Sequence, residues 1–212
     1  MSTIVYAHGG GFTSYDPEIG RLRTDALEAA GLRVVPVEYR LAPAHRHPAQ
    51  VDDVLDVYRS AKGPVVLLGE SAGGTIVLSA LLRLLADGDP LPAGVAAISP
   101  VADLTLPGGS FVTNDGADII TRDALRLSVE AYVSEAAAAS PSHGDFTGSP
   151  PLWLAVGTAE VLLDDVVTLA TSARESGVTT ELRVYEGAQH GFQFSGGYTV
   201  DKDLAAWIEA LG

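Results

Sequence analysis

Short apolar runs alternate with amphipathic segments along most of the chain. Strand-like runs rich in β-branched residues occupy residues 3–7, 33–38, 64–69, 94–99, 152–157 and 180–185. Helical periodicity falls between and after them, at about 18–30, 48–61, 74–86, 121–134, 165–176 and 200–211. Apolar strands separated by helices predict an α/β fold of about six parallel strands with helices on both faces. Residues 1–212 are expected to form a single domain, with an exposed loop at 136–150.

Composition narrows the class of protein. The chain has 212 residues, of which 47% are hydrophobic and 19% charged, and this balance is typical of a soluble enzyme. Its net charge of −14 argues against nucleic acid or an anionic membrane as a partner. The apolar runs are too short to span a bilayer, no cysteine is present, and we expect no export signal. We therefore expect a cytoplasmic protein without disulfides and without membrane insertion.

The third strand leads into the sequence Gly69-Glu70-Ser71-Ala72-Gly73, and an apolar helix follows. This strand, G-x-S-x-G turn and helix form the context of a nucleophile elbow. A sharp turn lifts the serine hydroxyl above the sheet, and the new helix N-terminus directs free amides at developing negative charge. Side chains at the flanking glycines would collide with neighbouring backbone. The pattern predicts Ser71 as a nucleophile.

The first strand is followed by His8-Gly9-Gly10-Gly11. Glycines let the backbone approach a substrate carbonyl and direct N–H groups at it. The Lys and Ser/Thr of a phosphate-binding loop are missing, which disfavours that alternative. Together with Ser71, the tract predicts an oxyanion hole made by the amides of Gly10, Gly11 and Ala72.

A catalytic serine on this turn requires an acid and then a histidine later in the chain. Of the five histidines, only His190 follows both Ser71 and the candidate acids. It lies in a glycine-bounded loop after the last strand. Glu160 lies closest to the end of the fifth strand and is the preferred acid. Asp164 remains the alternative, although Asp at the start of a helix is commonly an N-cap.

The loop after the second strand has a structural interpretation. Tyr39 and Arg40 are expected to anchor it by ring packing and ion pairing. His45 and His47 could bind a metal, but a third ligand at suitable spacing is missing. We expect both histidines to lie in a solvated surface loop, and we expect no metal and no organic cofactor.

Seven motifs in order resemble the bacterial hormone-sensitive-lipase-like esterases of the α/β-hydrolase superfamily. They are HGGGF (8–12), EYRLAPAH (38–45), GESAGG (69–74), SPVADLT (99–105), ASPSHGDFTGSPPL (139–152), EVLLDD (160–165) and HGF (190–192). The resemblance implies a serine carboxylesterase acting on short- to medium-chain acyl esters, with oxyanion donors at Gly10, Gly11 and Ala72. The family acid is usually Asp, and its position falls on Glu160. The resemblance also suggests a homodimer formed through the last strand and its neighbouring helix.

The chain departs from the family pattern at its start. In the family, a long segment with cap helices and two strands precedes HGGG, which here begins at residue 8. The expected sheet has the family order 4-3-5-6-7-8, with the strand at 33–39 on one edge, where Pro36 is tolerated. A reduced or absent cap would leave the site open. Residues 106–135 are expected to form either a pocket wall or ordinary core, including Phe111, Ile119, Ile120 and Tyr132.

The predicted mechanism is acyl transfer through Ser71, with His190 as the base and Glu160 as its partner. One alternative keeps these residues but makes the protein a deacetylase or amidase of a small metabolite. Another is a non-catalytic ligand-binding protein of the same fold. The sequence does not identify the physiological substrate.

Overall fold

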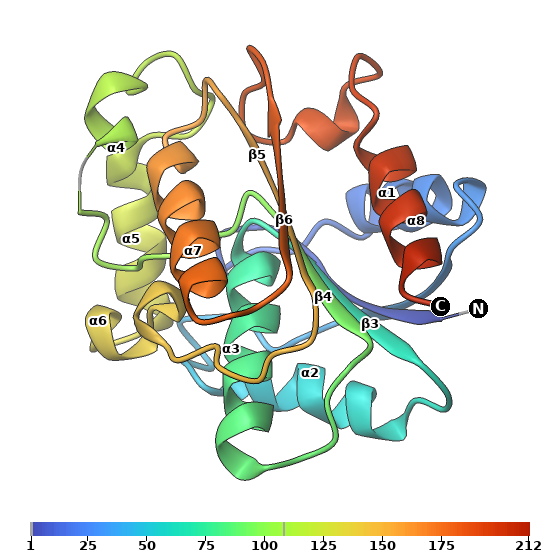
Figure 1. The fold of residues 1–212 in the computed structure, drawn as a ribbon. Coiled ribbons are helices and arrows are strands. Elements are labelled where there is room, and N and C mark those ends of the chain that lie inside the picture. The colour runs from blue at the N-terminus through green and yellow to red at the C-terminus, as the bar shows by residue number, and fades with distance from the viewer. Residues whose placement is uncertain (1, 108) are drawn as a thin grey trace.

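The computed structural model describes residues 2–107 and 109–212. Its six strands form one parallel sheet in the order β2-β1-β3-β4-β5-β6 (Figure 1). The strand bounds are β1 Thr3–Ala7, β2 Arg33–Val37, β3 Val65–Glu70, β4 Gly94–Ile98, β5 Leu152–Gly157 and β6 Thr180–Tyr185. This is the predicted order, with β2 and its Pro36 on an edge. The fold class predicted from the sequence is confirmed.

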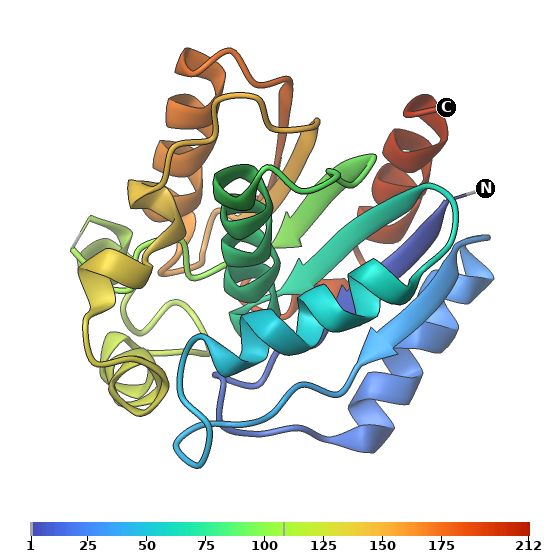
Figure 2. The ribbon, with the colours of Figure 1, turned by 90° about the horizontal axis from the view of Figure 1, so that it is seen from below.

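Helices cover both faces of the sheet (Figure 2). One face packs against α2 (Ala49–Ser60), α3 (Ala72–Asp87) and α7 (Leu163–Glu175). The other packs against α1 (Pro17–Ala29) and α8 (Val200–Ala210). Side chains along β1 alternate between the two faces of the sheet. Val5 packs in the core under α2 and α3, whereas Ile4 packs in the core under α1 and α8. The central strands are therefore buried on both sides, as in other parallel sheets.

Short elements fill the connection between β4 and β5. They are α4 (Ser110–Thr113), α5 (Arg122–Tyr132), α6 (Ala136–Ala139) and the 3-10 turn η1 (Pro141–His143). A second 3-10 turn, η2 (Phe192–Phe194), follows β6. Within the described residues, none of the helices has the length and apolar character needed to cross a bilayer.

The prediction of an exposed loop at 136–150 is wrong for part of this segment. Residues 136–139 form α6, and Pro141 and Phe146 are buried. Ser140, also buried, organises this segment: its hydroxyl donates to the Ala136 carbonyl and accepts the Leu104 N–H. The polar composition of the stretch conceals these buried positions, because the contacts are made to a segment far away in sequence.

Candidate active site

Ser71 sits at the junction of β3 and α3 in a strained backbone conformation, with φ 53° and ψ −122°. This left-handed φ is unusual for a residue with a side chain. A Cβ atom on Gly69 would overlap the backbone of Gly73, and one on Gly73 would overlap the backbone of Ala7. The two glycines therefore permit the close approach of strand and helix that the turn requires. The structure has the elbow geometry that the sequence predicts.

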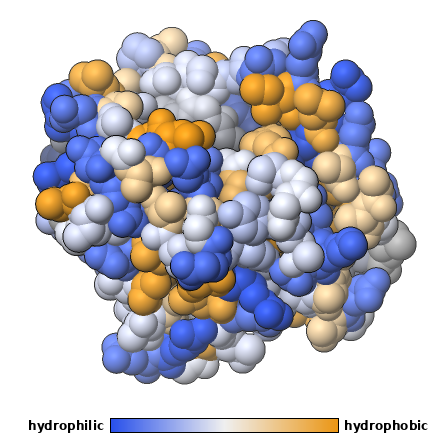
Figure 3. Space-filling model, turned by 90° about the horizontal axis from the view of Figure 1, so that it is seen from above, coloured by the Kyte–Doolittle hydropathy of each residue, from blue (hydrophilic) through white to orange (hydrophobic). Residues whose placement is uncertain are grey.

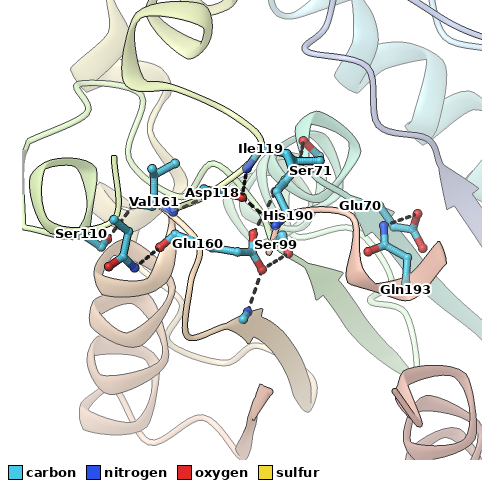
Figure 4. Close-up of polar contacts among 12 residues, drawn as sticks. Glu70, Ser71, Ser99, Ser110, Asp118, Ile119, Glu160, Val161, His190 and Gln193 are labelled. Carbon is cyan, nitrogen blue, oxygen red and sulfur yellow. Dashed lines mark hydrogen bonds and ion pairs between the residues drawn. The ribbon is translucent and has the colours of Figure 1, made fainter. Parts of the chain in front are cut away.

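Ser71, His190 and Glu160 form a continuous hydrogen-bonded chain across the ends of the central strands (Figure 4). The Ser71 hydroxyl donates to His190 Nε2 at 2.9 Å, and His190 Nδ1 donates to Glu160 Oε2 at 2.8 Å. A carboxylate can only accept, which fixes this tautomer of the imidazole. The arrangement can pass the serine proton to the imidazole.

Glu160 is fully buried, and its second oxygen is also satisfied. Oε1 accepts the Ser99 hydroxyl and the Gly157 N–H, each at 2.7 Å. These donors hold the carboxylate so that Oε2 faces the imidazole. Sequence reasoning did not single out Ser99; the available signal was its place directly after β4, at the end of the sheet where such sites form.

The environment of His190 favours its charged form. Burial lowers the pKa of an imidazole, but the hydrogen bond that His190 donates to Glu160 and the charge of that carboxylate outweigh burial and raise the pKa of His190 above 6.5. The charges of Asp118 and Glu70 act in the same direction. A base of this kind accepts a proton more readily than an isolated histidine does.

The three candidate oxyanion donors lie on two elements next to the serine. Ala72 is the first residue of α3, and Gly10 and Gly11 follow β1 with φ values of 118° and 58°. Among the backbone hydrogen bonds of the described residues, none uses the Gly10 or Gly11 N–H as its donor. The carbonyl of Gly10 instead accepts the backbone N–H and the hydroxyl of Ser14, which holds the loop.

A cavity of about 250 Å³ opens beside the serine. It runs between the start of α1 and η2, and its polar walls include His8, Tyr15, Glu70, Ser71, His190 and Gln193. Ile19 and Phe194 add exposed apolar side chains at its edge. Figure 3 shows the surface seen from above, where hydrophobic patches are separated by hydrophilic ones. The volume is suited to a small substrate group.

Glu70 occupies the other side of the elbow and is also buried. It forms an ion pair with Arg23, which in turn contacts Asp201 at 2.7 Å. The Tyr6 hydroxyl and the Gln193 side chain both donate to Glu70 Oε2 at 3.1 Å. This network links the elbow to α1, α8 and η2.

The structure separates the two candidate acids. The Asp164 carboxylate accepts the Ser110 N–H at 2.8 Å, whereas Glu160 is the one that contacts His190. Asp164 lies in the first turn of α7, but the N-cap position belongs to Leu162. The Asp164 carboxylate therefore caps the start of α4 rather than the start of its own helix.

The loop after β2 is anchored as predicted. Tyr39 stacks on His8 with ring centroids 4.1 Å apart, and Arg40 pairs with Asp53 at 2.9 Å. The prediction for His47 is wrong: it is half-buried, and its Nδ1 lies 3.0 Å from the Tyr132 hydroxyl.

The 106–135 segment does not line the cavity beside Ser71 with any described residue. Phe111 and Tyr132 are core residues, and Ile119 is exposed. Elsewhere too, the described ranges contain no group of three His, Cys, Asp or Glu side chains arranged to hold a metal ion.

Comparison with known proteins identifies the family. A family model described as "alpha/beta hydrolase fold" matches residues 4–194. A crystal structure of a hormone-sensitive lipase from a metagenome library superimposes on the whole chain with a TM-score of 0.93 at 32% identity, the chain covering 78% of it. An esterase from the bacterial hormone-sensitive lipase family gives 0.90 at 35% identity, over 99% of this chain and 75% of that one. The chain belongs to the α/β-hydrolase-fold family, among the hormone-sensitive-lipase-like esterases.

Curated relatives have matching names. An "Acetyl-hydrolase" of Streptomyces hygroscopicus is 39% identical over 187 residues, which cover 82% of this chain and 62% of that protein. An "Esterase" of Acinetobacter venetianus is 30% identical over 203 residues, covering 90% and 67%. The chain thus spans about two thirds of the length of these relatives.

Proposed function

We propose that this protein is a serine carboxylesterase that hydrolyses short- to medium-chain acyl esters. The observation that carries the proposal is the hydrogen-bonded chain from Ser71 through His190 to the buried Glu160. The names of the relatives and of the similar structures support an ester as the substrate. In this proposal Ser71 is the nucleophile, His190 the general base and Glu160 its acid partner.

The acylation step begins with His190 Nε2 taking the Ser71 proton while the serine oxygen attacks the ester carbonyl. The amides of Gly10, Gly11 and Ala72 stabilise the oxyanion that forms, aided by the N-terminus of α3. His190 then gives its proton to the leaving alcohol, and the acyl group remains on Ser71. Glu160 stabilises the imidazolium while this proton is held.

Deacylation repeats these steps with water. His190 takes a proton from a water molecule, which attacks the acyl-enzyme carbonyl; collapse of the second oxyanion returns the proton to Ser71 and releases the carboxylic acid. Every proton that leaves one oxygen is returned to another, so the cycle restores the enzyme.

Two other functions use the same residues differently. A deacetylase of a small metabolite is favoured by the acetyl-hydrolase relative and by the cavity of about 250 Å³, which suits a small group. In a non-catalytic ligand-binding role, the cavity would bind a ligand without converting it. The strain at Ser71 supports a catalytic role, because such conformations cluster at sites of chemistry.

A homodimer and a cytoplasmic location remain proposals. The sheet ends at β6, where Glu181, Arg183 and Val184 expose side chains along the edge. An edge strand of this kind can pair with its copy in a second molecule. Sedimentation at several protein concentrations tests the dimer: a single monomer mass at all concentrations would overturn it. The absence of cysteine supports the cytoplasm.

The decisive experiment measures hydrolysis of p-nitrophenyl esters from acetate to decanoate by the wild type and by Ser71→Ala. We expect activity on the shorter chains and a loss of at least about 10³-fold in the variant. Preference for acetate alone, together with activity on acetylated metabolites, would favour the deacetylase. A folded wild type no faster than Ser71→Ala would overturn the esterase and leave the ligand-binding role.

A further inference from the structure

Asp118 connects the two loops that carry Glu160 and His190. It lies between α4 and α5 and is 8% exposed. Its Oδ1 accepts the backbone N–H of His190 at 2.8 Å, and its Oδ2 accepts the backbone N–H of Val161 at 2.9 Å (Figure 4). One carboxylate thus binds the histidine itself and the residue directly after the acid.

Neighbouring residues of the same segment, residues 114–118, hold the same two loops. The Asn114 side-chain amide donates to the carbonyl of Glu160 at 2.8 Å and to that of Thr158 at 3.0 Å. The carbonyl of Ala117 accepts the side-chain amide of Gln189, the residue before His190. The Glu160 loop therefore makes three hydrogen bonds to the 114–118 segment, and the His190 loop makes two.

The partners of Asp118 show that its hydrogen bonds do more than stabilise a local turn. Asp118 also accepts the N–H of Ile119 at 2.8 Å, and that contact alone would stabilise its own loop. The remaining bonds reach residues 43 and 72 positions away in the chain. They end beside Glu160 and His190. The hydrogen bond between these two residues requires that their two loops stay in a fixed position relative to each other.

We propose that Asp118, assisted by Asn114, is a positioning residue that fixes the His190 loop and the Glu160 loop at the separation their hydrogen bond requires. This inference rests on the proposed esterase function. Asp118 does not contact the reacting atoms; it acts through the backbones of the two loops. Small displacements of a base from its nucleophile reduce rates by up to about 10²-fold, so the segment has a direct effect on turnover.

The charge of Asp118 gives the proposal a second observable. Three carboxylates act on the imidazole: Glu160 by contact, and Asp118 and Glu70 through space. All three raise the pKa of His190, against the opposing effect of burial. Removing one negative charge lowers that pKa, so the acid limb of the rate profile moves to lower pH.

The test compares Asp118→Asn with Asp115→Asn in hydrolysis of the p-nitrophenyl ester that the wild type prefers. Asp115 belongs to the same segment, is exposed, and makes no side-chain hydrogen bond within the described part of the chain, so it is a matched control for the charge. Rates are expressed per active site, titrated with a p-nitrophenyl phosphonate.

We expect Asp118→Asn to lower kcat about 10- to 100-fold with KM within threefold, and to shift the acid limb of the rate profile to lower pH. Asp115→Asn should stay within twofold of the wild type.

Equal kcat values and acid limbs for the two variants would overturn the proposal, as would a kcat loss smaller than threefold for Asp118→Asn. If Asp118→Asn does not fold, Asn114→Ala decides: a tenfold lower kcat without a shifted acid limb supports positioning, and a loss under threefold overturns it. Ser71→Ala separates the two proposals. Full activity in that variant would refute the esterase, whereas its inactivity combined with an unaffected Asp118→Asn would refute the positioning role alone.

Discussion

Two buried carboxylates flank Ser71, the proposed nucleophile, and have different surroundings. Glu70, 2% exposed, is ion-paired with Arg23 and receives hydrogen bonds from Tyr6 and Gln193. Glu160, 0% exposed, receives hydrogen bonds within the described residues from the neutral donors Ser99 and Gly157 and from the imidazole of His190. The one carboxylate is neutralised by a guanidinium, and the other is held by dipoles.

This difference is the one we expect between a carboxylate that stabilises the fold and one that acts as the acid of the proposed triad. A guanidinium balances much of the charge of Glu70, and that charge raises the pKa of His190 less than the charge of Glu160 does. The dipoles around Glu160 stabilise its negative charge without cancelling it, and the charge acts on His190. The raised pKa of His190, with Glu160 as the strongest raising influence, follows from this arrangement.

The largest expected effect comes from removing the charge of Glu160. Glu160→Gln keeps the size of the side chain but places an amide against the imidazole, so kcat should fall about 10³- to 10⁴-fold. The same change lowers the pKa of His190, and because the base must be neutral, the acid limb of kcat/KM moves to lower pH. A pH–rate profile from pH 4.5 to 9 measures both effects. Residual activity above a tenth of wild type would place the acid elsewhere.

Breaking the other pair should affect stability more than chemistry. Arg23→Met leaves Glu70 buried without its cation and should lower the free energy of unfolding by about 3–5 kcal/mol. Urea denaturation measures this loss, and kcat per folded molecule should change less than tenfold.

The double variant Arg23→Met/Glu70→Gln is the control for this pair, because it removes both charges. It should recover at least half of the stability that the single variant loses. A double variant as unstable as the single one would mean that Arg23 stabilises the fold by packing or through Asp201.

Asp165 is another buried carboxyl, and among the described residues it has neither a guanidinium nor a hydrogen-bond donor as its partner. Burial, together with the charges of Asp103 and Asp164, raises the pKa of Asp165 to about 7. Since this value exceeds the ordinary 3.8, the folded state binds the proton more tightly, and stability is lost as pH rises from about 4 to about 7. Asp165→Asn should therefore gain stability relative to wild type by roughly 2 kcal/mol more at pH 8 than at pH 5.5. Parallel urea curves at the two pH values would contradict this.

The sequence could predict that Ser71, Glu160 and His190 lie together because topology limits where the residues of the candidate site can lie. Strands of a parallel sheet end on the same side, so the residues following β1, β3, β5 and β6 had to meet. Chain order then selected His190, and closeness to the strand end favoured Glu160. The order of the strands, with β2 on an edge, followed from the family resemblance rather than from any local pattern.

What escaped prediction depends on contacts between distant segments. Ser99 reaches Glu160 across 61 residues, and Asp118 reaches His190 across 72. A lone serine or aspartate has no periodicity that would reveal such a partner. The half-buried position of His47 likewise depends on Tyr132, which is 85 residues away.

The hydrogen bond from Ser71 to His190 joins residues 119 positions apart, and it has a consequence for the time at which activity can arise. Closing so long a segment is entropically costly and occurs only when the intervening strands have paired. During synthesis, a nascent chain would remain inert until β6 and the loop after it had left the ribosome. Recovery of ester hydrolysis would then report the last step of refolding, whereas circular dichroism would already detect helices formed earlier.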